Sequence, residues 1–236
     1  MRILKNISER RFFNLKTFDT SLYLITDSSG FYEDEFLAIT EAALLGGVTL
    51  LQLREKEKTT REYIYLARKV HELSRKYNVP LIIDDRADVA YAVNAEGVHL
   101  GQSDMPVDIA RKMLGENKII GATAKTVLQA TEAYKLGADY LGVGAIYPTT
   151  TKVKTVLTPT KTLDDICKAV PIPVNAIGGL NADNLQILNG IGVSGICVVS
   201  AIMKSDTPKQ TAEKLLREIQ EMRCEHYENS ADNSRK

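Results

Sequence analysis

The stretch YLGVGAIYPTTTK, from Tyr140 to Lys152, joins a strand-like run to an abrupt change of chemistry. Its first part, Tyr140–Ile146, is a short continuous apolar run, which favours a buried strand over a helix. At Pro148 the run ends, and three threonines and a lysine follow. Hydroxyls, backbone N–H groups and an ammonium can together surround phosphate oxygens. The stretch therefore predicts a strand that ends at an anion site, and a polar surface turn is the alternative.

The same pattern repeats along the chain. From about Leu22, short apolar runs alternate eight times with longer segments that carry apolar residues at helical spacing. The strand-like runs are Leu22–Thr26, Val48–Leu53, Pro80–Ile83, Gly97–Leu100, Ile119–Ala122, Tyr140–Ile146, Pro173–Ile177 and Gly195–Ser200. Helical segments include Glu35–Leu45, Thr60–Tyr77, one that begins at Met105-Pro106, Thr126–Leu136, Leu163–Ala169, Ala182–Leu188 and Lys209–Met222. Several of them end at a glycine suited to a left-handed C-cap, namely Gly46, Gly115, Gly137 and Gly190.

Eight strand–helix units predict an α/β fold, a (β/α)8 TIM barrel that forms one domain over residues 21–223. An open doubly wound sheet is the alternative, but the first strand lacks the Gly-x-Gly-x-x-Gly turn of dinucleotide-binding sheets. Residues 1–20 form an N-terminal extension of unassigned role. The polar segment 224–236 is expected to be a disordered tail.

The composition favours a small-molecule partner. Thirty Lys and Arg residues balance thirty Asp and Glu residues, so nothing indicates nucleic acid or an anionic membrane. No apolar run approaches the roughly 20 residues of a membrane span, which predicts a cytoplasmic protein. The basic first 16 residues leave an organelle-targeting peptide as an alternative. The three cysteines are scattered and indicate neither a disulfide framework nor a zinc site. A homo-oligomer is compatible with the sequence.

Polar residues follow several of the predicted strands, and active sites of such barrels lie at the C-terminal strand ends. After the second strand, Gln52, Arg54 and Lys56 alternate with Leu53 and Glu55, so that the amide and the two cations share one side of an extended chain. A solvated charged loop is the alternative.

Carboxylates follow the third and fourth strands. Asp85 and Asp104 predict a Mg²⁺ site, because this ion usually takes one or two carboxylates and completes its shell with water and phosphate. Asp104 could instead cap a helix that begins near Pro106. The fifth strand adds the hydroxyl of Thr123. A single histidine at a strand end, His99, is more often a packed residue than a base.

A second anion site is predicted after the last strands. Gly178 and Gly179 permit close backbone approach, and the segment Val199–Ser200 follows the eighth strand. Loops after strands seven and eight are a frequent phosphate site of barrels. The sequence therefore predicts two anion sites, one cationic and metal-dependent and one built from backbone amides.

The chain resembles the thiamine phosphate synthase family over roughly Leu22 to Leu216. The resemblance rests on QLREK (52–56), DDR (84–86), GVHLGQ-x-D ending at Asp104, GADYLGVGAIYPTTTK ending at Lys152, and IGG followed by VVSAI. It implies a barrel enzyme that joins hydroxymethylpyrimidine diphosphate to thiazole phosphate, with one Mg²⁺ ion as cofactor. The products would be thiamine phosphate and diphosphate.

The resemblance also implies roles for individual residues. Asp85 and Asp104 would bind the metal, and Arg54, Lys56, Thr123 and Lys152 would act in catalysis. The pyrimidine diphosphate site would comprise Gln52, Leu53, Arg54, Glu55, Lys56, Asp84, Thr123 and Lys152. The thiazole phosphate site would comprise Thr149, Thr150, Thr151, Gly179, Val199 and Ser200.

Two positions depart from the family pattern. Asp84 stands where the family has asparagine, and it could join the metal shell, pair with a cation or hold a proton. Thr123 replaces serine and keeps the hydroxyl. Rival hypotheses are a thiazole tautomerase, a relative that lacks the pyrimidine diphosphate residues, a catalytically silent ligand-binding barrel, and another phosphate-handling barrel.

Overall fold

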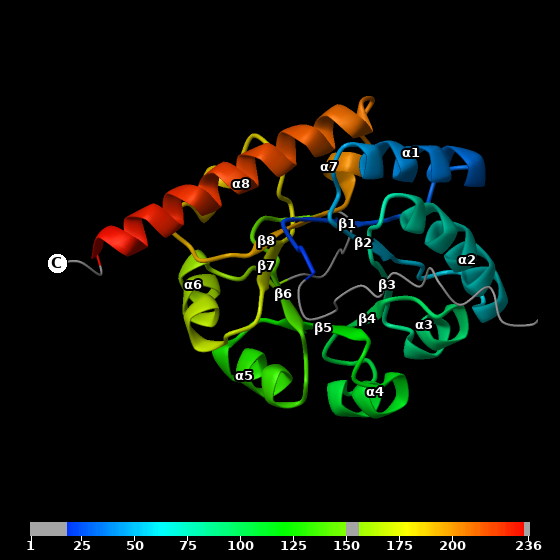
Figure 1. The fold of residues 1–236 in the computed structure, drawn as a ribbon, viewed down its shortest axis with the longest axis horizontal. Coiled ribbons are helices and arrows are strands. Elements are labelled where there is room, and N and C mark those ends of the chain that lie inside the picture. The colour runs from blue at the N-terminus through cyan, green and yellow to red at the C-terminus, as the bar shows by residue number, and fades with distance from the viewer. Residues whose placement is uncertain (1–17, 150–155, 234–236) are drawn as a thin grey trace, which may run out of the picture.

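The strand-like runs form one closed parallel barrel (Figure 1). The computed structural model describes residues 18–149 and 156–233, and for 225–233 it describes the backbone alone. The strands follow sequence order around the barrel, and the last pairs with the first. Their bounds are β1 (Leu22–Ile25), β2 (Leu50–Leu53), β3 (Leu81–Asp84), β4 (Gly97–Leu100), β5 (Ile119–Ala124), β6 (Tyr140–Gly144), β7 (Val174–Ile177) and β8 (Gly195–Val198). The predicted (β/α)8 barrel is therefore confirmed, and the open sheet is excluded.

The helices form an outer ring around the strands (Figure 1). They are α1 (Glu33–Leu45), α2 (Thr60–Lys76), α3 (Ala87–Val93), α4 (Val107–Leu114), α5 (Val127–Lys135), α6 (Thr160–Ala169), the 3-10 helix η1 (Leu185–Leu188), α7 (Ser200–Met203) and α8 (Pro208–Asn233). Helix α2 begins with a capping box, in which Thr59 accepts from the Glu62 N–H and the Glu62 carboxylate accepts from Thr59.

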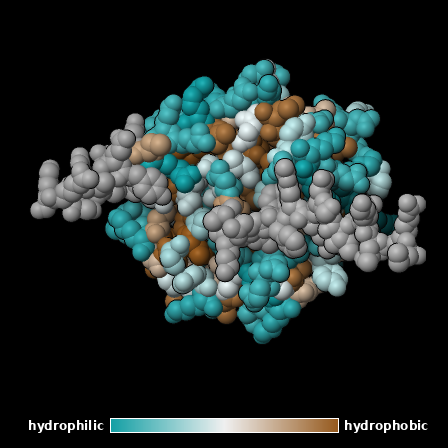
Figure 2. All heavy atoms as spheres, in the orientation of Figure 1, coloured by the Kyte–Doolittle hydropathy of each residue, from teal (hydrophilic) through white to brown (hydrophobic). Residues whose placement is uncertain are grey.

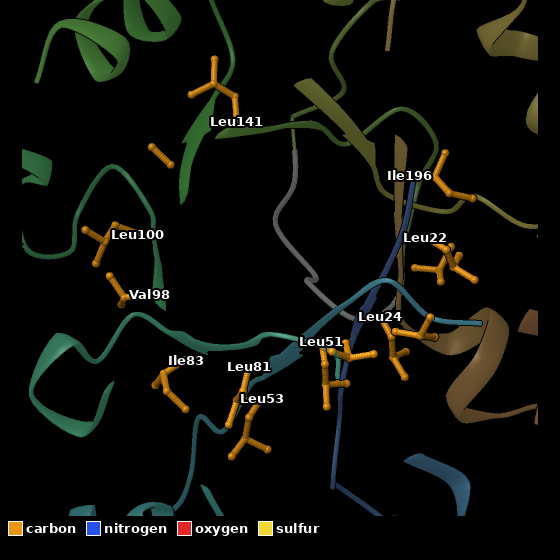
Figure 3. Packing of buried hydrophobic residues seen from close by; sticks show 14 of the residues in the cluster. Leu22, Leu24, Leu51, Leu53, Leu81, Ile83, Val98, Leu100, Leu141 and Ile196 are labelled. Atoms are coloured by element: carbon orange, nitrogen blue, oxygen red, sulfur yellow. The ribbon is translucent and has the colours of Figure 1, made fainter. Parts of the chain in front are cut away.

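Alternate side chains of each strand enter two separate cores. The outward side chains pack under the helices, and Figure 3 labels some of them, among them Leu51, Ile83 and Leu141, arranged around the ring of strands. The inward side chains form a smaller cluster of Tyr23, Ile25, Leu50, Ile82, Ile119, Tyr140 and Cys197. This period of two is what a strand with both faces buried requires. Each fully buried aliphatic side chain contributes about 1.5–3 kcal/mol, so the outer core supplies most of the apolar stabilisation.

The chain differs from the predicted elements at three places. The segment 182–188, expected to be an α-helix, contains the short 3-10 helix η1. Strand β8 ends at Val198, and Ser200 already begins α7. Gly46 has φ −81°, whereas Gly47 has the left-handed φ of +95°. Gly46 is needed for space, because a Cβ there would lie 2.3 Å from the carbonyl oxygen of Lys209 at the start of α8.

The last helix extends into the segment that the sequence predicts as a tail. The backbone of α8 continues through Cys224 to Asn233, and only 234–236 lie outside the described residues. The helix is anchored on the barrel by Ala212, Leu215 and Ile219, which are fully buried. Extending an anchored helix costs less than nucleating one, so polar residues of ordinary helix propensity can continue it.

The outer surface is consistent with these two cores. Figure 2 shows mainly hydrophilic residues over the helices of the visible face, with smaller hydrophobic areas between them. None of the helices in the ranges 18–149 and 156–233 combines the length and the apolar character that a membrane span needs.

Candidate active site

Charged side chains meet where β2 and β3 end. The Lys56 ammonium lies 2.8 Å from Asp84 Oδ2 and also hydrogen-bonds Asp85. Arg54 Nε lies 3.9 Å from the same Asp84 oxygen. Both cations face the end of the neighbouring strand. The alternative of a solvated charged loop is therefore excluded for Arg54 and Lys56.

The alternation after β2 separates the five residues 52–56 into two sets. Gln52 faces the barrel interior, where its Nε2 donates to the Tyr23 hydroxyl at 2.6 Å. Leu53 packs in the outer core. The Glu55 carboxylate is 5 % exposed and lies with Lys58 and Ser28, away from the Asp84 cluster. Leu53 and Glu55 can therefore reach a ligand in this site only through their backbone.

The three carboxyl groups of this cluster ionise differently. Burial, followed by the charge of Asp85, raises the pKa of Asp84 to about 6, against the effect of Lys56 and Arg54. Burial also opposes ionisation of Asp85, but the hydrogen bond and charge of Lys56 lower its pKa. Asp104 has a raised pKa, mainly from burial and in part from a hydrogen bond with Asp85. Such a split of pKa directions is typical of functional sites.

Asp85 and Asp104 come together as the metal prediction requires. Each carboxyl group is close enough to affect the pKa of the other, and a lysine ammonium already lies against Asp85. Asp85 also has φ +60°, an uncommon conformation for this residue type that is concentrated at functional sites. Two adjacent carboxylates suit a Mg²⁺ ion that takes its other ligands from water and phosphate. No group of three or more His, Cys, Asp or Glu side chains placed to hold a metal occurs within 18–149 and 156–224.

The alternative role of Asp104 as a helix cap is excluded. Helix α4 has Pro106 at its N-cap and no side-chain cap. Asp104 Oδ2 instead accepts from the Gly101 N–H at 2.7 Å, which closes a turn after β4. This turn holds the carboxyl group next to Asp85.

A hydrogen-bonded chain of buried side chains continues from Gln52 through the barrel. The hydroxyls of Tyr23 and Tyr140 are 2.7 Å apart, and the Tyr140 hydroxyl lies 3.0 Å from His99 Nδ1. On the other side of the ring, His99 Nε2 lies 3.0 Å from Thr123 Oγ1. Burial lowers the pKa of His99 to about 4, so the imidazole is neutral. The two tyrosines were not predicted, although a tyrosine at an inward strand position opposite a glycine such as Gly121 is a usable signal.

The second predicted site lies where β6, β7 and β8 end. Gly178 and Gly179 have φ of +104° and +66°. A Cβ at Gly179 would lie 2.6 Å from Tyr147 Cβ and 2.8 Å from the Pro148 carbonyl oxygen, so the two loops touch through their backbones. Val199 precedes the first turn of α7, which Ser200 begins.

Part of the predicted set falls outside the described residues. Thr149 closes the described part of the β6 loop, whereas Thr150, Thr151 and Lys152 lie beyond it. The structure therefore brings Arg54 and Lys56 together with Asp84 and Asp85 in one charged cluster, and it places Gly179 beside the β6 loop.

Comparison with known proteins gives one consistent result. The family model described as thiamine monophosphate synthase matches residues 22–202. The thiamine-phosphate synthase of Methanobrevibacter smithii is 50 % identical over 205 residues, which cover 87 % of this chain and 98 % of the relative. Thiamine-phosphate synthase 2 of Streptococcus pneumoniae is 49 % identical over 198 residues, 84 % of this chain and 94 % of that one.

A solved structure agrees with both relatives. The thiamine phosphate pyrophosphorylase from Pyrococcus furiosus superposes with a TM-score of 0.78 at 39 % identity, and the match covers 86 % of this chain and 96 % of the other. Sequence, fold and the arrangement of residues at the strand ends lead to the same assignment. The chain belongs to the thiamine monophosphate synthase family.

Proposed function

We propose that the protein joins 4-amino-2-methyl-5-(diphosphooxymethyl)pyrimidine to 4-methyl-5-(2-phosphooxyethyl)thiazole, giving thiamine phosphate and diphosphate. The observation that carries the proposal is the cluster at the ends of β2 to β4, in which Arg54 and Lys56 meet three carboxyl groups. The cations suit a diphosphate and the carboxylates suit its metal ion. A thiazole tautomerase would have no use for this second, cationic site.

The chain's own residues would act mainly on the leaving group. The bond from the pyrimidinylmethyl carbon to oxygen breaks, and its electron pair leaves on the diphosphate. Arg54, Lys56 and Lys152 neutralise the charge that develops there, which is the kind of preorganised electrostatic help that dominates many enzymes. The thiazole nitrogen then donates its lone pair to the carbon. Because this nitrogen carries no proton, no general base is needed, and His99 has no part in the bond-making step.

Asp85 and Asp104 would hold one Mg²⁺ ion. When bound, the ion supplies positive charge to the diphosphate oxygens. The Lys56 ammonium at Asp85 would move toward the diphosphate when a divalent cation takes its place at the carboxylate. Asp84 keeps its contacts with Lys56 and Arg54 and so anchors the cations on the side of β3.

The thiazole phosphate would bind at the ends of β6 to β8. Glycine at 178 and 179 lets backbone N–H groups approach the phosphate, and the Val199–Ser200 backbone adds N–H groups at the first turn of α7. Thr149, with the threonines at 150 and 151, would supply hydroxyls from the opposite loop. The site would therefore bind one ligand with charged side chains and the other mainly with backbone groups.

The test is a coupling assay with the full-length protein, the two substrates and Mg²⁺. Thiamine phosphate is oxidised to its fluorescent thiochrome form, with Asp85→Ala as the variant and a chelator as a second control. We expect metal-dependent product that Asp85→Ala abolishes. If the wild type binds both substrates by titration calorimetry and forms no product, the protein is a ligand-binding barrel instead.

A further inference from the structure

Five side chains from five strands connect the two ends of the proposed pyrimidine diphosphate site. They run in the order Gln52, Tyr23, Tyr140, His99, Thr123, and every successive pair is within hydrogen-bond distance, between 2.6 and 3.0 Å. The first and last members are the predicted ligands of the pyrimidine and of the diphosphate. The three members between them have no role in the proposed function.

The fold reserves space for the middle of this chain. A Cβ on Gly121 would lie 2.1 Å from Tyr140 Cζ, and a Cβ on Gly142 would lie 3.2 Å from His99 Cε1. Both glycines are at inward positions, Gly121 on β5, which pairs with β4 and β6, and Gly142 on β6 opposite Thr123. The ring of Tyr140 also meets that of Tyr23 edge-on, with centroids 5.7 Å apart. The polar chain is thus a packed part of the barrel interior.

The hydrogens in this chain can be followed from one end. Gln52 Nε2 donates to the Tyr23 oxygen. Within the described residues, Tyr23 Oη has no hydrogen bond except those with Gln52 and Tyr140, so its proton goes to Tyr140. A proton without an acceptor in this fully buried place would cost about 1–3 kcal/mol. The Tyr140 proton then goes to His99 Nδ1.

A neutral imidazole continues the same donor-to-acceptor direction of the hydrogen bonds. It carries one proton, and because Nδ1 accepts from Tyr140, the proton is on Nε2 and is donated to Thr123 Oγ1. The hydroxyl proton of Thr123 is then left for a ligand. At the other end, the amide of Gln52 gives one of its two N–H groups to Tyr23, so its carbonyl oxygen is left to accept and its second N–H is left to donate. The site therefore presents an acceptor at residue 52 and a hydroxyl donor at residue 123.

We propose that Tyr23, Tyr140 and His99 are positioning residues that fix this polarity for a substrate with an amino group at one end and an anion at the other. The inference rests on the proposed function, because it gives the aminopyrimidine a partner in the Gln52 oxygen and the diphosphate a partner in the Thr123 hydroxyl. The reversed chain would present an N–H at residue 52 and only an acceptor at residue 123. It would match neither end of that substrate.

The first measurement is the tautomer of His99, which does not depend on activity. The chain has three histidines, so the protein labelled with ¹⁵N-histidine gives a simple long-range ¹H–¹⁵N spectrum at pH 7, and His99→Gln assigns the signals. We expect His99 to be neutral with its proton on Nε2. A proton on Nδ1, or a charged ring, would overturn the proposed polarity even if the enzyme is active.

The second measurement is a double-mutant cycle on kcat/KM for the pyrimidine diphosphate. Thr123→Val should lower it about 10- to 100-fold by removing one donor to the leaving group. Tyr140→Phe should lower it roughly 10-fold, and the double variant should be no worse than Thr123→Val, because Tyr140 acts through Thr123. If the losses of kcat/KM in the two single variants multiply in the double variant, the proposed role of Tyr140 is wrong.

A matched control distinguishes the effect of Tyr140→Phe from the general effect of removing a tyrosine hydroxyl. Tyr77→Phe removes a hydroxyl that bonds Glu41 on the outside of the barrel, and it should change neither the tautomer nor the cycle. If the wild type has no coupling activity, the proposed function fails, whereas the spectrum still decides whether the hydrogen-bonded chain has the stated direction.

Discussion

The two ends of the barrel use charge in opposite ways. At the N-terminal ends of the strands, Arg111 and Glu96 each have partners of their own. Arg111 binds Asp139 at 2.6 Å and also three backbone carbonyls. One carboxylate oxygen of Glu96 lies 3.1 Å from His71 Nε2, and the other accepts from the Leu81 N–H at 3.0 Å. These contacts link the loops at the N-terminal ends of the strands to each other.

At the C-terminal ends, by contrast, two cations share three carboxyl groups. Lys56 lies between Asp84 and Asp85, Arg54 Nε lies further away, at 3.9 Å from Asp84, and the Asp104 carboxyl group is held near Asp85 by the Gly101 N–H. This cluster carries more negative than positive groups until a further cation enters. The difference indicates that the N-terminal end is built for stability and the C-terminal end for exchange of ligands, as is general in such barrels.

The largest effect is expected from Lys56→Met at the C-terminal end. It removes the cation that two carboxylates share and that the leaving group needs, so coupling should fall by roughly 100- to 1,000-fold. Because Asp85 loses its ammonium partner, Mn²⁺ or Mg²⁺ should bind more tightly in the absence of substrate. Kinetics and metal titration measure the two changes. Lys58→Met, which affects the Glu55 contact, is the control, and weaker metal binding by Lys56→Met would contradict the competition.

Arg111→Met should show the opposite behaviour. Its guanidinium donates to Asp139 and to the carbonyls of Gly115, Lys118 and Gly137, and these half-buried acceptors would lose charge-assisted bonds. We expect the free energy of unfolding to fall by about 2–4 kcal/mol. Urea unfolding measures this loss, and kcat/KM of the folded variant should be unchanged. A variant of full stability and low activity would reverse the assignment of the two ends.

The architecture and the residues of the C-terminal end could be predicted because they depend on short-range patterns. Period-two burial in strands such as Tyr140–Gly144 and polar residues directly after them are visible in the sequence. A strand end also fixes which way alternating residues face. For this reason Arg54 and Lys56 were correctly expected to share a side.

The rest depends on contacts across the barrel, which local patterns do not specify. The bond between Tyr23 and Tyr140 joins residues 117 positions apart and requires the register of β1, β8, β7 and β6 together. Likewise, the length of α8 depends on the barrel surface that anchors it. The sequence leaves open how the Asp84 carboxyl group is compensated. In the structure its partners are Lys56 and Arg54.

Asp84→Asn tests how much one carboxyl group contributes to the negative charge of the cluster at the C-terminal end. The change restores the asparagine of the family pattern, keeps the shape, and removes one of the two carboxylates that hold Lys56. We expect activity to be retained and the Mg²⁺ concentration at half-maximal rate to change several-fold, because Lys56 then pairs more fully with Asp85. Initial rates at varied Mg²⁺ measure it. Unchanged metal dependence together with unchanged KM for both substrates would show that Asp84 has no part in the balance.

The smallest effect is expected from Glu96→Gln at the N-terminal end, and it should depend on pH. Burial alone would raise the pKa of Glu96, but the hydrogen bond and charge of His71 and the Leu81 N–H lower it below its ordinary 4.5. A carboxyl group with a lowered pKa binds its proton more weakly when folded. Its stabilisation is therefore present above about pH 4.5 and is lost as the pH falls through the folded value.

Urea unfolding at pH 7, 5 and 4 should show the wild type more stable than Glu96→Gln by about 1 kcal/mol at pH 7, and by less at pH 4. The exposed Glu72→Gln on the same helix as His71 is the matched control and should change stability little at any of these pH values. Neither variant should alter the Mg²⁺ dependence of coupling, because both positions lie away from the carboxyl cluster. A pH-dependent loss of stability that also changed metal dependence would mean that the two ends of the barrel are coupled through the strands between them.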